Sequence, residues 1–404
     1  MKYYIIAGEA SGDLHGSNLV KGLLEKDPSA QIRAWGGELM RQAGAEVVKD
    51  YRENSIMGFV EVVANIGKIL GNMKECCKDI LAFNPDVVIL IDYPGFNMKI
   101  AKFAKKHGLK VFYYIAPKVW AWKERRVHKI KRYVDKLFII FPFEVEYFRK
   151  WGIETVYRGN PLLDSVCNFS HAGESRAAFE ARTSPKRQVI CTTAAEPTTA
   201  AAAMPIIAAL AGSRKMETGF LLPRIVRTAL AMPQYRFIIA AAPSMEPEYL
   251  KKIIQKELAA AGAPAGSSQA GGCNIEIVYG ETYAVLQQSV AAIISSGTAS
   301  LEAALLKTPQ VVCYGGNPIS FYIAKAVVKL KYISLANLIL DKLIFKEILQ
   351  NDCTPANISA ELEALINQKT YRDAMLADYD KVHQLLGGGG ASGRIAEAMI
   401  EELK

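Results

Sequence analysis

The run Val290-Ala291-Ala292-Ile293-Ile294 leads, after Ser295, into Ser296-Gly297-Thr298-Ala299-Ser300-Leu301-Glu302. The apolar run predicts a buried strand, and the pattern from Leu301 onward predicts a helix. Gly297 and Thr298 then lie at a strand-to-helix turn, where the first N–H groups of the helix lack partners and the helix dipole is positive. A diphosphate fits such a turn, and Glu302 could accept hydrogen bonds from a ribose. The alternative is an ordinary helix start in which the Glu302 carboxylate only complements the helix dipole.

The same alternation of strand and helix patterns recurs along the 404 residues. We expect strands at 3–7, 86–91, 110–115, 136–141, 206–210, 235–240, 274–278, 290–294 and 310–314. Alternating units of this kind form doubly wound parallel sheets, and a chain longer than about 300 residues divides into domains. We therefore predict two Rossmann-like α/β domains, 1–170 and 171–350. Helices in 351–404 would pack back on the N-terminal domain or on a partner chain.

The net charge and the cysteine content limit the kinds of partner that the protein can bind. The net charge of +9 favours an anionic partner such as phosphate groups, nucleic acid or an anionic membrane surface. The seven cysteines are scattered, without a CxxC pair or a Cys/His cluster, so we expect no metal site and reduced thiols in a cytoplasmic protein. No stretch of about 18 apolar residues lacks both charge and proline, so any membrane contact would be peripheral.

Asp92 follows the strand predicted at 86–91 and precedes the turn Tyr93-Pro94-Gly95-Phe96-Asn97. In open parallel sheets ligands bind beyond the carboxyl ends of the strands. A carboxylate that is partly desolvated there could act as a general base. An Asp that only caps the turn is the alternative.

Gly212-Ser213-Arg214 follows the strand predicted at 206–210. Arginine meets phosphate oxygens with a planar, permanently charged fork. The sequence shows no Asp-x-Asp metal-binding cluster, so a leaving diphosphate would need protein cations and helix N-termini. An exposed surface arginine is the alternative for Arg214.

The first loop, Gly8-Glu9-Ala10-Ser11-Gly12-Asp13, lacks both the G-x-G-x-x-G spacing and a Gly-Lys-Ser/Thr triplet. A nicotinamide site is therefore a poor interpretation, and the loop is not a Walker A loop. Glu9, Ser11 and Asp13 offer polar contacts to a sugar, whereas a plain turn with Asp13 starting the helix is the alternative.

Residues 117–136 contain eight Lys/Arg and two acids, interleaved with Trp120, Trp122 and Tyr133. A basic helix with aromatic anchors suits an anionic membrane surface or RNA, and a solvated basic face is the alternative. Asn337 is a polar residue at the end of an apolar run, unremarkable by itself.

In their order and spacing these stretches resemble the lipid-A-disaccharide synthase family, bacterial inverting glycosyltransferases (family 19) with the GT-B architecture. The resemblance extends from residue 1 to about 350. It is carried by Gly8 to Asp13, Met57-Gly58-Phe59-Val60-Glu61-Val62, Ile91 to Asn97, Pro117-Lys118-Val119-Trp120-Ala121-Trp122, Gly159-Asn160-Pro161-Leu162, Gly212 to Arg214, Ser296 to Glu302, and Tyr332-Ile333-Ser334-Leu335-Ala336-Asn337-Leu338.

The resemblance implies a fold and residue roles. The fold is α/β, with two Rossmann-like domains whose parallel sheets face a central cleft. Asp92 would be the general base, and Asn337 matches a position that the family needs for activity. The UDP-sugar would lie on Gly212, Ser213, Arg214, Gly297, Thr298 and Glu302. The acceptor side would include Glu9, Ser11 and Asn97, and membrane docking would use Trp120, Trp122, Lys123, Arg125 and Arg126.

The implied reaction joins UDP-2,3-diacylglucosamine to 2,3-diacylglucosamine 1-phosphate (lipid X), without metal or cofactor. It would run on the cytoplasmic face of the inner membrane, in a monomer or homodimer that binds no nucleic acid. The alternatives are another UDP-sugar GT-B enzyme, such as a UDP-GlcNAc 2-epimerase-like one, and a non-catalytic RNA- or membrane-binding protein. The chain departs from the family at Ala336, where proline is usual, and at 192–203 and 262–272.

Overall fold

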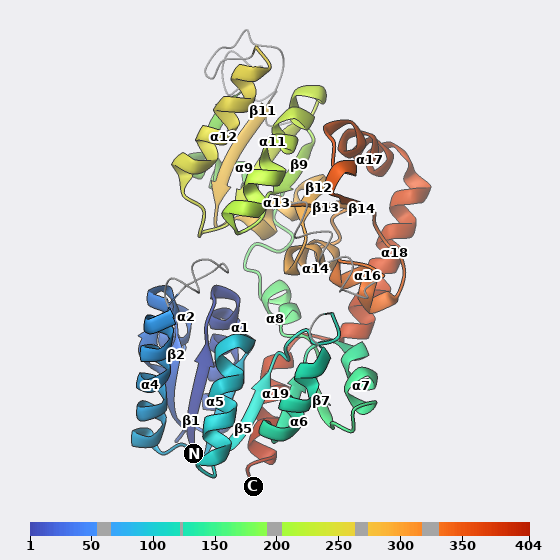
Figure 1. Cartoon of the computed structure of the whole chain (residues 1–404). Coiled ribbons are helices and arrows are strands. Elements are labelled where there is room, and N and C mark those ends of the chain that lie inside the picture. Colours follow the sequence, from blue (N-terminus) through green and yellow to red (C-terminus); the bar gives the residue numbers. More distant parts are fainter. Residues whose placement is uncertain (55–65, 122–123, 192–203, 263–273, 317–330) are drawn as a thin grey trace. The chain divides into compact units, whose positions relative to one another are not determined.

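The computed structural model describes residues 1–54, 66–121, 124–191, 204–262, 274–316 and 331–404 (Figure 1). Its contacts form two compact units. Unit 1 contains residues 1–164 and 386–404, and unit 2 contains residues 165–385. The predicted motif at 57–62, Trp122, Lys123, segment 192–203 and nearly all of 262–272 lie outside the described residues.

Unit 1 is built on a seven-stranded parallel sheet with the strand order β3-β2-β1-β4-β5-β6-β7. The chain first runs outward from β1 to β3, then returns to the other side of β1 and continues from β4 to β7. The strands are Lys2–Ala7, Gln31–Gly36, Glu46–Asp50, Val87–Ile91, Lys110–Tyr114, Lys136–Ile139 and Thr155–Tyr157 for β1 to β7. The helices are α1 (Ala10–Lys26), α2 (Glu38–Gln42), α4 (Ile66–Phe83), α5 (Pro94–Lys106), α6 (Val127–Tyr133), α7 (Pro142–Arg149) and α19 (Ala391–Glu401), with short 3-10 turns at Tyr51–Asn54 and Glu124–Arg126.

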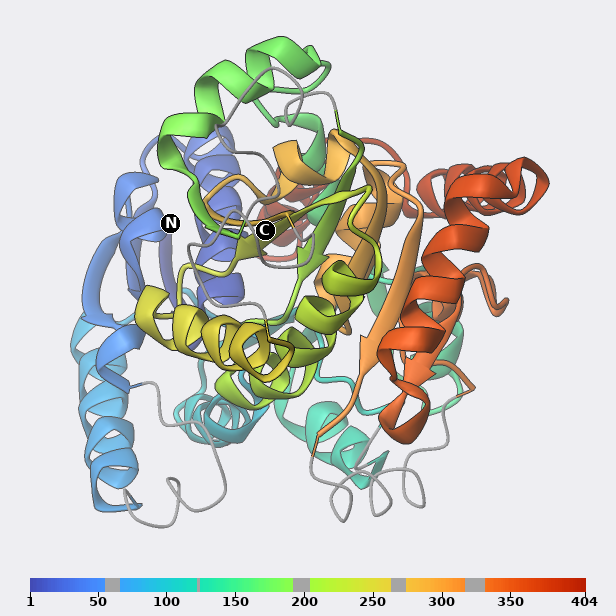
Figure 2. The same cartoon turned by 90° about the horizontal axis from the view of Figure 1, so that it is seen from above.

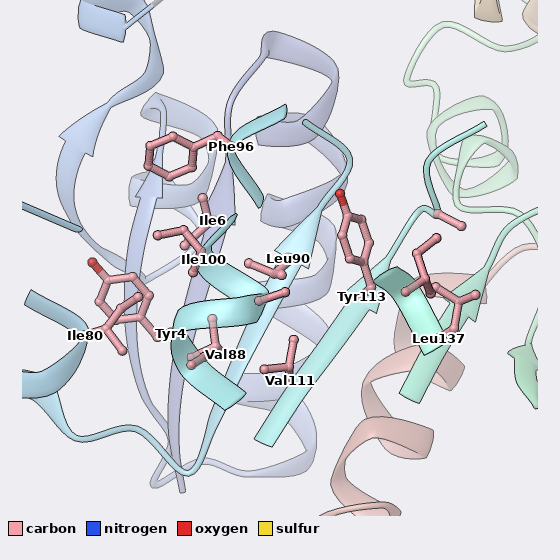
Figure 3. Close-up of a cluster of buried hydrophobic side chains, with 14 of the residues drawn as sticks. Tyr4, Ile6, Ile80, Val88, Leu90, Phe96, Ile100, Val111, Tyr113 and Leu137 are labelled. Carbon is pink, nitrogen blue, oxygen red and sulfur yellow. The ribbon is translucent and has the colours of Figure 1, made fainter. Parts of the chain in front are cut away.

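Alternate residues of the unit 1 strands enter two different cores, because successive side chains of a strand point to opposite faces. Tyr4, Ile6, Val88, Leu90 and Val111 pack with Ile80 of α4 and Ile100 of α5, as Figure 3 shows. Helix α1 packs on α19, so the last helix of the chain belongs to the first unit.

Unit 2 has a seven-stranded sheet in the order β14-β13-β12-β9-β10-β11-β8. Here the chain runs outward from β9 to β11, returns to the other side of β9 at β12, and continues outward to β14. The strands are Gln188–Cys191, Ile206–Leu210, Arg236–Ala241, Asn274–Tyr279, Ser289–Ser295, Gln310–Tyr314 and Glu347–Leu349 for β8 to β14. Strand β8 is antiparallel to β11, and the other pairs are parallel.

The helices of unit 2 cover both faces of this sheet. They are α9 (Arg176–Thr183), α11 (Lys215–Ala231), α12 (Pro247–Ala260), α13 (Thr282–Gln287), α14 (Thr298–Leu305), α16 (Leu335–Leu340), α17 (Pro355–Asn367) and α18 (Lys369–Leu386), with α8 (Leu162–Cys167) at the start of the unit and 3-10 turns at Ser184–Lys186 and Gln350–Asp352. Helices α9, α13 and α14 pack on one core through Phe179, Val285 and Ala303. Helix α11 lies beside α12, as Figures 1 and 2 both show, and also packs on α17.

The predicted two-domain α/β fold with parallel sheets is confirmed. The nine predicted strands match observed strands to within two residues at each end, and Ile206–Leu210 and Gln310–Tyr314 match throughout. The sequence prediction missed β2, β3, β7, β8 and β14. The predicted central cleft stays a prediction.

Candidate functional site

Each sheet has one place where the direction of strand addition reverses. In unit 1 this switch point lies between β1 and β4, and in unit 2 between β9 and β12. Crossover helices leave adjacent strands in opposite directions there, which opens a crevice at the carboxyl ends of the two strands. Gly8 and Asp92 follow the strands of the first switch point, and Gly212 and Ser296 those of the second.

Asp92 has an unusual backbone. Its φ is +44° and that of Tyr93 is +47°, so two consecutive non-glycine residues adopt the left-handed conformation. Such residues cost of order 1–3 kcal/mol each and persist where the surroundings hold them. The Asp92 carbonyl accepts hydrogen bonds from Tyr113 Oη at 2.5 Å and from Asn97 Nδ2 at 2.9 Å. The half-buried Asp92 side chain is therefore presented on a turn that the sheet and α5 hold in place.

Asn97 contributes to the acceptor side through this turn. It is fully buried, and its Nδ2 also donates to the Ile91 carbonyl at 3.1 Å. The geometry therefore makes Asn97 a positioning residue for Asp92. Its predicted place on the acceptor side stays a prediction.

The β1–α1 loop and the Asp92 turn contact each other through Gly8 and Tyr93. A Cβ on Gly8 would lie 2.4 Å from the Tyr93 ring, so only glycine fits under it. Glu9, the half-buried N-cap of α1, lies close enough to raise the pKa of the Tyr93 hydroxyl, although burial of Tyr93 is the larger cause. Ser11 is exposed on the first turn of α1. The structure thus brings Glu9 to the same switch point as Asp92.

Asp13 has a structural role that the sequence did not suggest. It is buried, and its carboxylate accepts from the backbone N–H groups of Gly37 at 2.8 Å and of Leu39 and Met40 at 3.1 Å. These are orphan donors at the N-terminus of α2, so Asp13 caps that helix. The suggested sugar contact through Asp13 is therefore not supported by this geometry.

The second switch point brings together the predicted donor residues. Gly212 has φ +105°, and a Cβ on it would lie 3.2 Å from Ser295 Oγ at the end of β12. Gly297 has φ +127° and precedes α14, with no atom within 4 Å of its Cβ position. Glycine is needed at Gly297 for its backbone conformation, and the space beside it is open. The strand-to-helix turn predicted at Gly297 and Thr298 is confirmed.

Arg214 is the N-cap of α11, and its side chain is 56% exposed. Its Nη1 lies 3.5 Å from Glu217 Oε1, and the Ser213 N–H donates to Glu217 Oε2 at 3.3 Å. The Glu217 carboxylate therefore already contacts the Arg214 guanidinium and the Ser213 N–H at the start of α11. A diphosphate binding there would share or replace those contacts, which is the chemistry of an anion site.

Glu302 lies on α14 beside a residue that the sequence analysis missed. Tyr283 Oη donates to Glu302 Oε1 at 3.3 Å, and the Tyr283 ring packs edge-on against Phe169. Burial raises the pKa of the Glu302 carboxyl, and the hydrogen bond from Tyr283 opposes that rise. The sequence signal that could have found Tyr283 is its position, because it is an aromatic residue shortly after the end of β11.

Asn337 is fully buried in α16 and fully engaged within the fold. Its Nδ2 donates to the Phe345 carbonyl at 3.1 Å and to Glu347 Oε1 at 2.9 Å, and its Oδ1 accepts from Ile344 N at 2.9 Å. Glu347 also accepts from Ile333 N and Ser334 N, which ties the start of α16 to β14. This geometry supports a positioning role, and a direct catalytic contact stays a prediction.

Trp120 is half-buried, and its indole N–H points into the protein. Its Nε1 donates to Glu144 Oε1 at 3.0 Å, and the other Glu144 oxygen accepts from Phe141 N at 3.1 Å. Burial raises the pKa of the Glu144 carboxyl to about 7. Arg125 is exposed and Arg126 is half-buried. The basic segment therefore presents Arg125 to solvent, whereas the half-buried Trp120 is tied to Glu144.

Among the described residues no group of three or more His, Cys, Asp or Glu is placed to hold a metal ion. In the same part of the chain no helix is long and apolar enough to cross a membrane.

Comparison with known proteins decides the family. The sequence model of the family described as Lipid-A-disaccharide synthetase matches residues 3–389. The chain is 35% identical over 403 residues to a lipid-A-disaccharide synthase of Geobacter metallireducens, covering 99% of this chain and 96% of the relative. A synthase of Trichlorobacter lovleyi is 34% identical over 402 residues, covering 98% and 96%.

The chain belongs to the lipid-A-disaccharide synthetase family. The resemblance carried by the short motifs is thereby confirmed, and lipid-A-disaccharide synthases are glycosyltransferases. The epimerase-like and RNA-binding alternatives are not favoured.

The fold of this synthetase-family chain is shared more widely. A UDP-GlcNAc 2-epimerase from Neisseria meningitidis, solved with UDP-GlcNAc bound, superposes with a TM-score of 0.67 over 99% of this chain and 100% of the epimerase. The two sequences are only 14% identical, so this likeness shows the GT-B fold alone.

Proposed function

We propose that this chain joins UDP-2,3-diacylglucosamine to 2,3-diacylglucosamine 1-phosphate and releases a tetra-acyl disaccharide 1-phosphate and UDP. The observation that carries the proposal is the position of the candidate residues. Each of the two switch points, where α/β sheets bind ligands, holds one chemically distinct set. The set in unit 2 contains Arg214 and the glycines Gly212 and Gly297. The set in unit 1 contains the carboxylates of Glu9 and Asp92.

Unit 2 would bind the UDP-sugar. The exposed Arg214 and the open turn at Gly297 follow the two neighbouring strands of the unit 2 switch point, β9 and β12, so both could meet one diphosphate. The guanidinium and the N-termini of α11 and α14 would stabilise the charge that develops on the leaving diphosphate. Glu302, held by Tyr283, would accept hydrogen bonds from the ribose hydroxyls.

Unit 1 would bind the acceptor, with Asp92 as the general base. Its carboxylate would take the proton from the acceptor hydroxyl as that oxygen bonds to the anomeric carbon. The bond from the anomeric carbon to the diphosphate oxygen would break in the same displacement, and the electron pair would leave with UDP. A single displacement inverts the anomeric configuration and needs no covalent nucleophile, unlike the double displacement of retaining enzymes.

The acylated substrates suggest work at a membrane surface. The exposed Arg125 and its basic neighbours Lys129 and Arg132 would attract anionic lipid head groups. We propose peripheral attachment to the cytoplasmic face of the inner membrane, as a monomer or homodimer. Weak dependence of vesicle binding on salt would contradict this electrostatic attachment.

Product analysis tests the proposed function. Purified protein is incubated with the UDP-sugar alone, with the acylated acceptor alone, and with both, and the products are identified by mass spectrometry. The proposal expects disaccharide and UDP only when both are present. A UDP-sugar epimer formed from the donor alone would instead favour an epimerase, because an epimerase needs no acceptor.

A further inference from the structure

Unit 1 contains a pocket that the residue roles above do not use. It spans about 420 Å³ including its open mouth and lies at the carboxyl ends of β1 and β2. Most of its lining is apolar or aromatic: Ile6, Ala7, Trp35, Ile69, Tyr93 and Phe96. We call it the aromatic pocket.

Three rings form one wall of the aromatic pocket. Phe96 stacks on Trp35 with ring centroids 5.8 Å apart and on Tyr93 with centroids 5.6 Å apart. Figure 3 shows the Phe96 ring close to Ile6, within the packed side chains on this face of the sheet. Because Gly8 leaves room for the Tyr93 ring, this wall reaches the switch point itself. The wall is therefore built from side chains that packing holds in place.

The aromatic pocket also adjoins the proposed base. Tyr93 lines it and directly follows Asp92, and both residues share the left-handed turn. A ligand whose reacting hydroxyl lies at Asp92 would have its neighbouring substituents at the pocket mouth. An apolar substituent would lose its contact with water by entering.

The polar groups of the lining fit an uncharged chain better than an anion. Lys49, Tyr51 and Asn72 contribute polar side chains to the lining, and the Lys49 ammonium pairs with the Glu75 carboxylate at 3.3 Å. Trp35 is 6% exposed, and its Nε1 is buried. An apolar chain needs no polar partner from such a wall.

We propose that the aromatic pocket takes one acyl chain of the diacylglucosamine 1-phosphate acceptor, an inference that rests on the proposed function. The sugar hydroxyl then lies at Asp92 and the chain runs along the aromatic wall toward α4. The pocket would make the enzyme selective for the length of the acceptor's acyl chain.

Two substitutions on α4 test this assignment. Ile69→Trp replaces an aliphatic side chain of the lining with a larger indole ring, whereas the matched control Leu70→Trp adds the same ring at a side chain that is 52% exposed and outside the lining. KM is measured for long-chain and short-chain acceptors at saturating donor. We expect Ile69→Trp to raise KM for the long-chain acceptor about tenfold and to change the short-chain KM little. Leu70→Trp should resemble the parent enzyme with both acceptors.

Three other outcomes have distinct meanings. Equal KM changes for both chain lengths in Ile69→Trp would overturn the pocket assignment and leave the proposed function standing. If side chains of the protein itself fill the pocket, Ile69→Trp lowers the Tm while the ratio of the two KM values stays at the parent value, which also overturns the assignment. If the parent protein forms no disaccharide with either acceptor, the proposed function fails and the assignment fails with it.

Discussion

The Tyr283 hydroxyl donates a hydrogen bond of 3.3 Å to the Glu302 carboxylate, joining α13 to α14 beside the open turn at Gly297. Burial raises the pKa of the Glu302 carboxyl and so favours its protonated form. The hydrogen bond from Tyr283 opposes that rise and holds the carboxylate in place. The donor half of the proposed site therefore depends on a tyrosine that no motif contains.

UDP-sugar binding should depend on the ionisation of Glu302. A carboxylate accepts two ribose hydrogen bonds better than a protonated acid does, so affinity should fall as pH decreases through the raised pKa of Glu302. Tyr283→Phe removes the hydrogen bond that opposes the rise, so the midpoint of this loss should move to higher pH. Calorimetric titration with a UDP-sugar, whose doubly esterified diphosphate does not titrate in this range, measures the midpoint.

The same carboxyl gives a stability prediction of defined sign. Its folded pKa is raised, so the folded state binds more protons than the unfolded state between the two pKa values, and stability falls as pH rises through that window. Glu302→Gln should remove this part of the pH dependence and also flatten the pH profile of UDP-sugar binding. A Glu302→Gln profile that still falls at low pH like that of the parent would contradict the assignment of Glu302 to the ribose.

Arg214→Ala should weaken UDP binding by about tenfold to hundredfold, the range expected for losing hydrogen bonds between a guanidinium and phosphate. Arg227 provides a matched control. It lies on the same helix and its side chain is 58% exposed, against 56% for Arg214, but it pairs with Glu257 away from the helix start. Arg227→Ala should bind UDP as the parent does. Equal affinities for the two variants would exclude Arg214 from the diphosphate site.

Asn337→Ala should destabilise unit 2 by about 2–4 kcal/mol, because buried N–H and C=O groups at Ile344 and Phe345 lose their partners. Glu347→Gln keeps an acceptor oxygen for the start of α16 and should cost less. Thermal unfolding measures the loss of stability, and turnover well below the Tm measures activity. An Asn337→Ala protein of parental Tm that has lost turnover would favour a direct catalytic contact over positioning.

The parallel strands were predictable because residues such as Val87–Ile91 are apolar without interruption, which strands buried on both faces require. The missed strands are short or carry charge. Strand β8 follows Arg187, whose guanidinium is buried against Glu180 and Glu276, so its neighbourhood looks polar in the sequence. Strand β14 has three residues, and its first, Glu347, is occupied with capping α16.

The candidate site divides in the same way. Asp92, Arg214 and Gly297 could be predicted because each is a charged residue or a glycine that comes shortly after a strand. Ligands of α/β sheets bind at those strand ends. The roles of Asp13, Asn97 and Asn337 depend on which backbone groups lack partners in the folded chain. Those partners are set by tertiary contacts, such as Asp13 with Gly37, so residue type alone did not reveal them.

The central claim is that Asp92 deprotonates the acceptor, and the turnover of Asp92→Asn at saturating donor tests it most directly. Asp86→Asn, at the amino end of the same strand, is the matched control. We predict that Asp92→Asn binds UDP with parental affinity and forms disaccharide at least about a hundredfold more slowly, while Asp86→Asn keeps the parental rate. Disaccharide formation by Asp92→Asn at a rate close to that of the parent would contradict the account.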